Sequence, residues 1–251
     1  MLLDLNFLGI DMLTFVTALF DGKKLGIPHS TGIYDGTWVD KLYRGIERNY
    51  SGDFNLVCLV DKEYDDIKES VSQVPFLNMG RGWICIIEKF RPDLTRGKRF
   101  TLGLDTIITG NIDEICSFGG PMGMISDTMD TGRVCNGITI ADSKSCDYVW
   151  NVWTNRREGV YNTFTMFGDV PSEMLWLRDL FDQGGYCPRL DKIYPNKIFS
   201  YKMQFRHNPD LLETASIVYF HGSPKPHEIN SKKFDAYLGY KFAPKLLEHW
   251  I

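Results

Sequence analysis

Two segments of the chain carry residue types that can bind a metal ion and a diphosphate. Asp105 interrupts an apolar run, where a carboxylate is costly to bury unless it is paired, hydrogen-bonded or bound to a metal. Far along the chain, His221 and Lys225 stand in the sequence HGSPKP, a loop that two prolines restrain. Imidazole is a ligand for Mn²⁺, and a fixed ammonium suits a phosphate oxygen. Alternatively, Asp105 caps the following turn, and the loop is a surface turn with a solvated lysine.

Three further polar side chains could meet a sugar. Asn136 lies in a turn before an apolar run, and its amide could bind sugar hydroxyls or simply serve the turn. Asp169 and Glu173 flank Ser172, a plausible N-cap of the next helix. They could be sugar-binding or catalytic carboxylates, or acids that the helix dipole favours. Three aromatic residues could stack on a base or a sugar, or pack in the core: Tyr34, Trp38 and Trp83.

A framework of strands and helices must bring these residues together. Apolar, β-prone runs predict strands over 13–20, 54–60, 100–109, 122–126, 138–141, 197–201 and 217–220. Helical periodicity predicts helices over 37–50, 145–155 and 172–182, and a short turn or helix over 112–116. Segment 82–90 fits either a strand or a helix. Strands that alternate with helices predict an α/β fold with a mostly parallel central sheet flanked by helices, whose ligands bind beyond the carboxyl ends of the strands.

The bulk composition is that of an ordinary globular protein. The chain has 251 residues, of which 43% are hydrophobic and 24% charged, and its net charge of -4 lacks the basic excess of a dedicated nucleic-acid binder. Six cysteines without a C-x-x-C pair argue against a zinc site and favour a reducing compartment. No apolar run is long enough for a membrane span, and the first residues make a poor signal peptide, so we expect a cytoplasmic protein.

In their order along the chain, these motifs resemble the GT-A glycosyltransferases, most of all family 8 with glycogenin and its small bacterial and phage relatives. The resemblance covers most of the chain, from about Leu13 to Glu228. Its parts are segments 34–48, 57–61, 82–83, 104–113, 136–137 and 200–202, together with the loop at His221, which is the most specific of them. The resemblance implies a single GT-A, Rossmann-like domain over residues 1–251, with an N-terminal extension over 1–12 and a C-terminal tail over 231–251.

The resemblance also implies roles for individual residues. In this family an Asp-x-Asp motif and a late histidine hold the metal against the donor diphosphate, which assigns the binding of Mn²⁺ or Mg²⁺ to Asp105 and His221. Contact with the phosphates falls to Lys225 and Gly222. Catalytic positions near the sugar or the acceptor are Asn136, Asp169 and Glu173. The remaining donor-binding positions are Thr17, Leu19 and Tyr34 near the base, and Gly103 and Leu104 in the acidic motif.

Two positions depart from the family pattern. Gly103 stands where the first acid of the Asp-x-Asp motif is expected, so one metal ligand is missing. A water molecule, Asp127, Asp61 or another carboxylate could take its place. The lysine that the family carries a few residues after its Gly-Trp pair is absent too, with Ile86 near that point. Either metal binding is weakened, or the chain has lost activity and only binds a nucleotide sugar.

The resemblance implies a retaining glycosyltransferase that transfers a sugar from a UDP-sugar donor with the help of a divalent ion. The acceptor stays open between a glycan, a small molecule and modified DNA. One alternative is a DNA-modifying enzyme of the phage type that acts on hydroxymethylated bases, against which the acidic net charge argues. The other is a catalytically degenerate protein that binds nucleotide sugars, which Gly103 favours.

Overall fold

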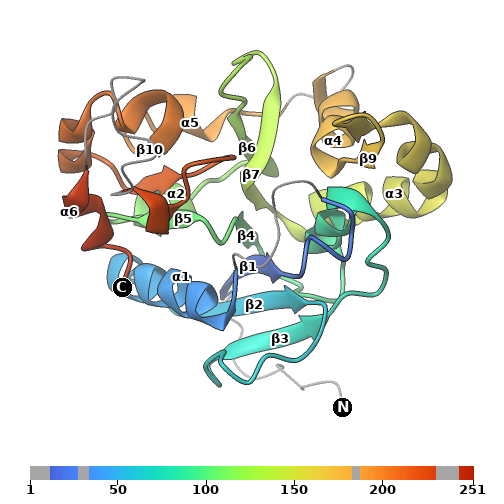
Figure 1. Cartoon of the computed structure of the whole chain (residues 1–251), viewed down its shortest axis with the longest axis horizontal. Coiled ribbons are helices and arrows are strands. Elements are labelled where there is room, and N and C mark those ends of the chain that lie inside the picture. Colours follow the sequence, from blue (N-terminus) through green and yellow to red (C-terminus); the bar gives the residue numbers. More distant parts are fainter. Residues whose placement is uncertain (1–11, 28–33, 183–186, 230–242) are drawn as a thin grey trace.

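The computed structural model is an α/β structure built around a six-stranded central sheet (Figure 1). It describes residues 12–27, 34–182, 187–229 and 243–251. All but the last residue of the predicted N-terminal extension and most of the predicted C-terminal tail therefore lie outside the described residues. The strands of the central sheet are β1 (Leu13–Leu19), β2 (Phe54–Val60), β3 (Val71–Pro75), β4 (Arg99–Leu102), β6 (Met122–Ser126) and β7 (Val134–Ala141).

The central sheet is mostly parallel, as predicted. Its order is β3-β2-β1-β4-β7-β6, in which β1 to β4 run parallel and β7 runs antiparallel to both of its neighbours. β1 and β2 pair in continuous register from Leu13 with Phe54 to Leu19 with Val60. Most side chains of these two strands are buried. Parallel sheets are covered on both faces, and this is why the two strands appear in the sequence as predominantly apolar runs.

A second sheet has three strands in the order β10-β11-β5, namely β10 (Ile198–Ser200), β11 (Ile217–Tyr219) and β5 (Thr106–Ile108). β5 runs antiparallel to β11. The single strand predicted over 100–109 is wrong in this respect, because the chain leaves the central sheet after Leu102 and enters the second sheet at Thr106. The acidic interruption is therefore the short segment that carries the chain from one sheet to the other.

Helix α1 (Gly36–Asn49) closely matches the helix predicted over 37–50. Its N-cap Asp35 accepts a hydrogen bond from Thr37 N–H at 3.0 Å, which satisfies one of the free donors of the first turn. The C-terminal residues dock on this helix, where Lys41 Nζ donates to the Trp250 carbonyl at 3.0 Å. Its apolar stripe is buried in the main core and consists of Trp38, Val39, Leu42 and Ile46.

Segment 82–90, which the sequence left between strand and helix, is the 3-10 helix η1 (Gly82–Phe90). α3 (Ser143–Thr163) extends beyond both ends of the predicted 145–155. β3 was not predicted, because only Val71 of this edge strand is buried. The other elements are α2 (Asp113–Cys116), α4 (Glu173–Asp182), α5 (Leu190–Ile193), α6 (Pro244–Leu247), β8 (Thr165–Met166), β9 (Val170–Pro171), the π-helical turn η2 (Tyr201–Phe205), and the 3-10 turns η3 (Pro209–Glu213) and η4 (Pro226–Glu228).

In Figure 1, α3, α4 and β9 gather on one side of the molecule, α5, α6 and β10 on the other, and β6 and β7 stand between them. The crossing segment between β4 and β5 lies below this pair of strands in the same view. Among the described helices, none combines the length and the apolar character that a bilayer crossing needs.

Candidate active site

The two segments that the sequence singled out meet at the carboxyl ends of β4 and β11. The backbone carbonyl of Asp105 accepts a hydrogen bond from Phe220 N–H at 3.1 Å. This bond continues the pairing of β5 with β11, in which Thr106 faces Tyr219. Asp105 is thereby fixed next to the loop that begins at His221. A site at the carboxyl ends of strands is where an open α/β sheet binds ligands.

Two other side chains of the predicted site engage the Asp105 carboxylate. Its Oδ2 accepts a hydrogen bond from the Tyr34 hydroxyl at 3.2 Å and forms an ion pair with Lys225 Nζ. The side chains of Lys225 and Asp105 are 14% and 16% exposed, so the pair is largely shielded yet still open to solvent on one side. Burial, followed by the Asp105 charge, raises the pKa of Tyr34 above its ordinary value, which keeps the phenol protonated as a donor.

His221 is a neutral imidazole held by hydroxyl groups. Its Nε2 lies 3.0 Å from Ser200 Oγ and 3.4 Å from Thr128 Oγ1. The Ser200 hydroxyl accepts from Met203 N–H at 3.2 Å, which leaves its own proton to be donated to Nε2. Burial, followed by the charge of Lys202, lowers the pKa of His221. The ring is therefore uncharged at neutral pH, and the lone pair of Nε2 is already in use.

The loop after His221 opens with a glycine whose backbone conformation other residues rarely adopt. Gly222 has a φ of +61°, in the left-handed region. A Cβ at this position would lie 3.7 Å from Lys202 Nζ, so the Lys202 ammonium lies beside the Gly222 backbone. We call the residues gathered here the loop cluster: Tyr34, Asp105, Lys202, His221, Gly222 and Lys225. Its exposed backbone and two ammonium groups suit an anionic ligand.

The described residues of the loop cluster do not fit a divalent ion. Within the part of the chain that the structure describes, no three His, Cys, Asp or Glu side chains are grouped so that they could hold a metal. Asp105 is paired with Lys225, and Nε2 of His221 is bonded to hydroxyl groups. A Cβ at Gly103 would lie 2.9 Å from Asp105 Oδ1, so even the missing acid would require the Asp105 carboxylate to move. Metal binding by Asp105 and His221 stays a prediction that this geometry does not favour.

The two carboxylates named above as replacements for the missing acid, Asp127 and Asp61, are bonded to other groups. Asp127 forms an ion pair with Arg178, and its Oδ1 accepts hydrogen bonds from two backbone N–H groups, each at 2.9 Å. Asp61 Oδ1 accepts from the Tyr64 hydroxyl at 2.8 Å, and its Oδ2 accepts from a backbone N–H at 3.3 Å. Neither side chain is free to complete a metal site.

The structure brings together two of the residues predicted near the sugar. Asn136 Nδ2 donates to Glu173 Oε1 at 3.1 Å, and both side chains are buried. The second oxygen of Glu173 is buried without a hydrogen-bond partner among the described residues. Burial raises the pKa of Glu173, although the hydrogen bond from Asn136 and the charge of Lys89 act in the opposite direction. We call Lys89, Asn136 and Glu173 the buried cluster.

Lys89 links the buried cluster to the loop cluster. Its Nζ donates to the Leu102 carbonyl at the end of β4 over 3.4 Å, and the Thr17 hydroxyl donates to the same carbonyl at 3.0 Å. Burial lowers the pKa of Lys89, whereas the charges of Glu173 and Asp105 act to raise it. Lys89 therefore lies in the field of both acids.

The sequence did not single out Lys89, because the lysine was expected nearer to Ile86. Both residues lie in η1, and side chains three residues apart are eclipsed on a 3-10 helix. Lys89 consequently occupies the same face of η1 as Ile86, one turn further on. A charged pair, Glu88 and Lys89, inside an otherwise apolar run was the signal that could have identified it.

Other predicted residues belong to neither cluster. Asp169 stands in the turn between β8 and β9, where its side chain is 80% exposed and paired with Arg81. Leu19 and Leu104 are buried in the main core, so their side chains do not face a ligand. Trp38 also lies in the core and packs edge-on against the Tyr34 ring, with 4.8 Å between the ring centroids. Trp38 therefore supports Tyr34 from behind.

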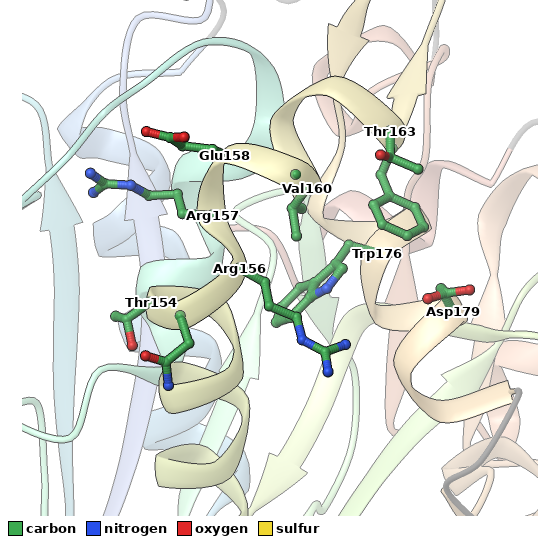
Figure 2. Close-up of a pocket in the computed structure, with 11 residues that line it drawn as sticks. Thr154, Arg156, Arg157, Glu158, Val160, Thr163, Trp176 and Asp179 are labelled. Atoms are coloured by element: carbon green, nitrogen blue, oxygen red, sulfur yellow. The ribbon is translucent and has the colours of Figure 1, made fainter.

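A separate cleft of about 570 Å³ opens between the C-terminal half of α3 and α4. Figure 2 shows Arg156 and Val160 of α3 beside Trp176 and Asp179 of α4 along its wall. No residue of the loop cluster or of the buried cluster lines this cleft. It is therefore distinct from the predicted donor site.

Solved structures share this architecture. The glycosyltransferase GlyE of Streptococcus pneumoniae TIGR4 superposes with a TM-score of 0.62 at 13% identity, over 96% of this chain and 61% of that one. The galactosyltransferase LgtC, solved with donor and acceptor sugar analogs, gives 0.60 at 11% identity over 94% of both chains. The bifunctional glycosyltransferase WbbM gives 0.60 at 12% identity over 98% of this chain and 50% of that one. No protein-family profile and no curated protein sequence matches the chain.

The fold is that of the GT-A glycosyltransferases, as the resemblance implied. The chain spans about three fifths of the length of GlyE, half that of WbbM, and nearly all of LgtC. At these identities the likeness establishes the fold, and the activity must be argued from the site.

Proposed function

We propose that the chain is a glycosyltransferase that takes its sugar from a UDP-sugar donor. The observation that carries this proposal is the hydrogen bond from Phe220 N–H to the Asp105 carbonyl. It joins in space two segments that lie far apart in the sequence and that resemble the diphosphate-binding motifs of GT-A enzymes. The fold shared with three glycosyltransferases supports the same class of reaction.

The loop cluster would serve the diphosphate end of the donor. When the bond to the sugar breaks, negative charge develops on the nucleoside diphosphate, and groups that already face this charge lower the barrier. Lys225 is held in place by Asp105 and can turn its other ammonium protons to a phosphate oxygen. The neutral His221 ring can donate from Nδ1, since its Nε2 is occupied by hydroxyl groups.

The buried cluster would serve the sugar end. Asn136 gives an amide proton to Glu173, which leaves Asn136 Oδ1 as an acceptor for a sugar hydroxyl. Glu173 is buried and fixes the orientation of this amide. Retention of configuration, implied by the resemblance, is part of the proposal, and Asp169 is a candidate on the acceptor side because its carboxylate is exposed.

Release of UDP from a panel of UDP-sugars, followed by mass spectrometry with glycan, small-molecule and hydroxymethylated DNA acceptors, tests the proposal. We expect the wild type to consume at least one donor and Lys225→Ala to lose this activity. Lys144→Ala is the matched control, because Lys144 is an exposed lysine of α3 outside both clusters. Wild-type protein that consumes no donor in any combination would contradict the proposal.

A protein that binds nucleotide sugars without turnover is the second candidate, and Gly103 specifically favours it because it removes an expected carboxylate. Calorimetry with UDP gives binding under both candidates, so it does not separate them. Turnover separates them: UDP binding without any release of UDP from a donor establishes the binding protein.

A further inference from the structure

We propose that Lys202 neutralises the donor diphosphate together with Lys225, so that this site binds its nucleotide without a divalent metal ion. The inference rests on the proposed function for the identity of the nucleotide. It assigns to Lys202 a role that a metal ion would otherwise have, and it makes Lys202 a binding residue of the loop cluster.

One negative charge of the family's metal site, the carboxylate expected at position 103, is missing here. Two carboxylates and a divalent ion cancel in charge, and so do one carboxylate and one lysine. With glycine at position 103, the loop cluster keeps the single carboxylate of Asp105, and Lys225 is paired with it. A metal ion at this point would have to displace Lys225 from Asp105. The ion pair therefore already occupies the place of the metal with its own positive charge.

Lys202 lies next to the loop that follows His221. Its ammonium lies beside the Gly222 backbone, where an added Cβ would be 3.7 Å from Nζ. Its charge also helps to lower the pKa of His221, as expected for an ammonium close to that ring. The position of Nζ beside Gly222 therefore puts Lys202 at the loop that the proposed function assigns to the phosphates.

Hydrogen bonds of Ser200 hold the backbone around Lys202 beside the His221 loop. Lys202 is the second residue of η2, a π-helical turn that directly follows β10. Ser200 fixes this turn at both sides: its Oγ accepts from Met203 N–H at 3.2 Å, and its N–H donates to Gln204 Oε1 at 3.0 Å. The same Ser200 hydroxyl bonds His221, so the turn with Lys202 and the loop are tied together. π-helical turns of this kind are frequent at functional sites.

The ion pairs that the described residues form near Lys202 involve other cations. Lys225 pairs with Asp105, and Arg178 pairs with Asp127. Among the described residues, no carboxylate forms an ion pair with Lys202. Within the described part of the chain, this positive charge therefore faces the loop without a carboxylate partner, as a diphosphate site requires.

Calorimetric titration with UDP, and with uridine as a probe that lacks phosphate, tests the inference in EDTA and in Mn²⁺. We expect wild-type affinity for UDP in EDTA and in Mn²⁺ to agree within about twofold. Lys202→Ala should weaken UDP binding at least about tenfold in EDTA, as the loss of a hydrogen bond to a charged group does. Its affinity for uridine should stay unchanged. Lys144→Ala is the matched control and should bind UDP like the wild type.

The outcomes separate this inference from the proposed function. UDP binding that requires Mn²⁺ in the wild type, or Lys202→Ala that binds UDP as tightly as the wild type, overturns the inference and leaves the proposed function intact. A wild type that binds UDP in neither condition overturns both. Lys202→Arg, which keeps the charge and the fold, should retain most of the affinity, and an equal loss in Lys202→Arg and Lys202→Ala would also overturn the role of the charge.

Discussion

The loop cluster and the buried cluster handle charge in opposite ways. In the loop cluster, Asp105 and Lys225 keep about one sixth of their side chains exposed and neutralise each other. In the buried cluster, Glu173 and Lys89 are almost completely enclosed, and burial moves the pKa of each toward its uncharged form. The difference indicates that a lysine of the loop cluster can leave its carboxylate partner and bind an anionic ligand. The buried cluster is built to hold one amide in a fixed orientation.

The largest effect is expected from removing Lys225, the lysine of the loop cluster that pairs with Asp105. Lys225→Ala leaves Asp105 as a negative charge that faces the diphosphate, so we expect kcat/KM for the preferred donor to fall by at least about 100-fold. Lys225→Ala with Asp105→Asn should recover part of this loss, because the repulsion is then removed. Steady-state kinetics of the two variants measure this. Equal activity in both would show that the Asp105 charge does not matter, and the comparison of clusters would fail.

The second prediction concerns pH and the buried cluster. The folded-state pKa of Glu173 is raised by burial, so its protonated form is favoured in the folded state. Stability from this group is present below its ordinary value of 4.5 and is lost as the pH rises through the raised pKa. Glu173→Gln should remove this loss and be more stable than the wild type by about 1–2 kcal/mol at pH 8, but not at pH 4.

Urea unfolding at the two pH values measures the effect of Glu173→Gln. The control is Glu158→Gln, an exposed glutamate of α3, which should show no such pH dependence. If the difference between Glu173→Gln and the wild type is the same at both pH values, folding does not shift the pKa of Glu173, and the contrast between the two clusters is wrong.

The contrast also explains what the sequence could reveal. The strands over 54–60 and 122–126 were predicted correctly, because the burial of most of their residues leaves short, largely apolar runs. The division of 100–109 between two sheets could not be predicted, because Thr106 pairs with Tyr219 far along the chain. Local sequence patterns do not record such partners. The same holds for the ion pair of Asp105 with Lys225.

The candidate site shows the same limit. The resemblance pointed to Asn136 and Glu173, and they are in contact. Glu173 is also an acid of the first turn of α4, as the alternative interpretation predicted, so its place in the sequence did not separate the two roles. Lys89 was not predicted as a site residue, because the spacing along η1 follows a 3-10 helix with three residues per turn. Asp169 looked equivalent to Glu173 in sequence, yet a two-residue strand places it at the surface.

A smaller effect should come from the glycine of the loop cluster. Gly222 and Gly26 both have a φ in the left-handed region, at +61° and +71°. Changing either one to alanine should destabilise the fold by about 1–2 kcal/mol, because a Cβ is strained there. Only Gly222→Ala should also weaken UDP binding, by a few-fold, because its Cβ would lie next to Lys202. Thermal unfolding and calorimetry together distinguish the two effects. Equal UDP affinity in both variants would remove Gly222 from the site.

The smallest effect is expected where the loop cluster departs most from a metal site. Gly103→Asp adds a carboxylate beside Asp105, and the added Cβ would lie 2.9 Å from Asp105 Oδ1, the movable end of a side chain. The Asp105 carboxylate can turn away, and two acids together can then attract Mn²⁺. We expect Mn²⁺ to strengthen UDP binding by Gly103→Asp about threefold and to leave Gly103→Ala and the wild type unaffected. Calorimetry with and without Mn²⁺ measures this change. A wild type that already responds to Mn²⁺ as strongly as Gly103→Asp would show that the two lysines do not replace the ion.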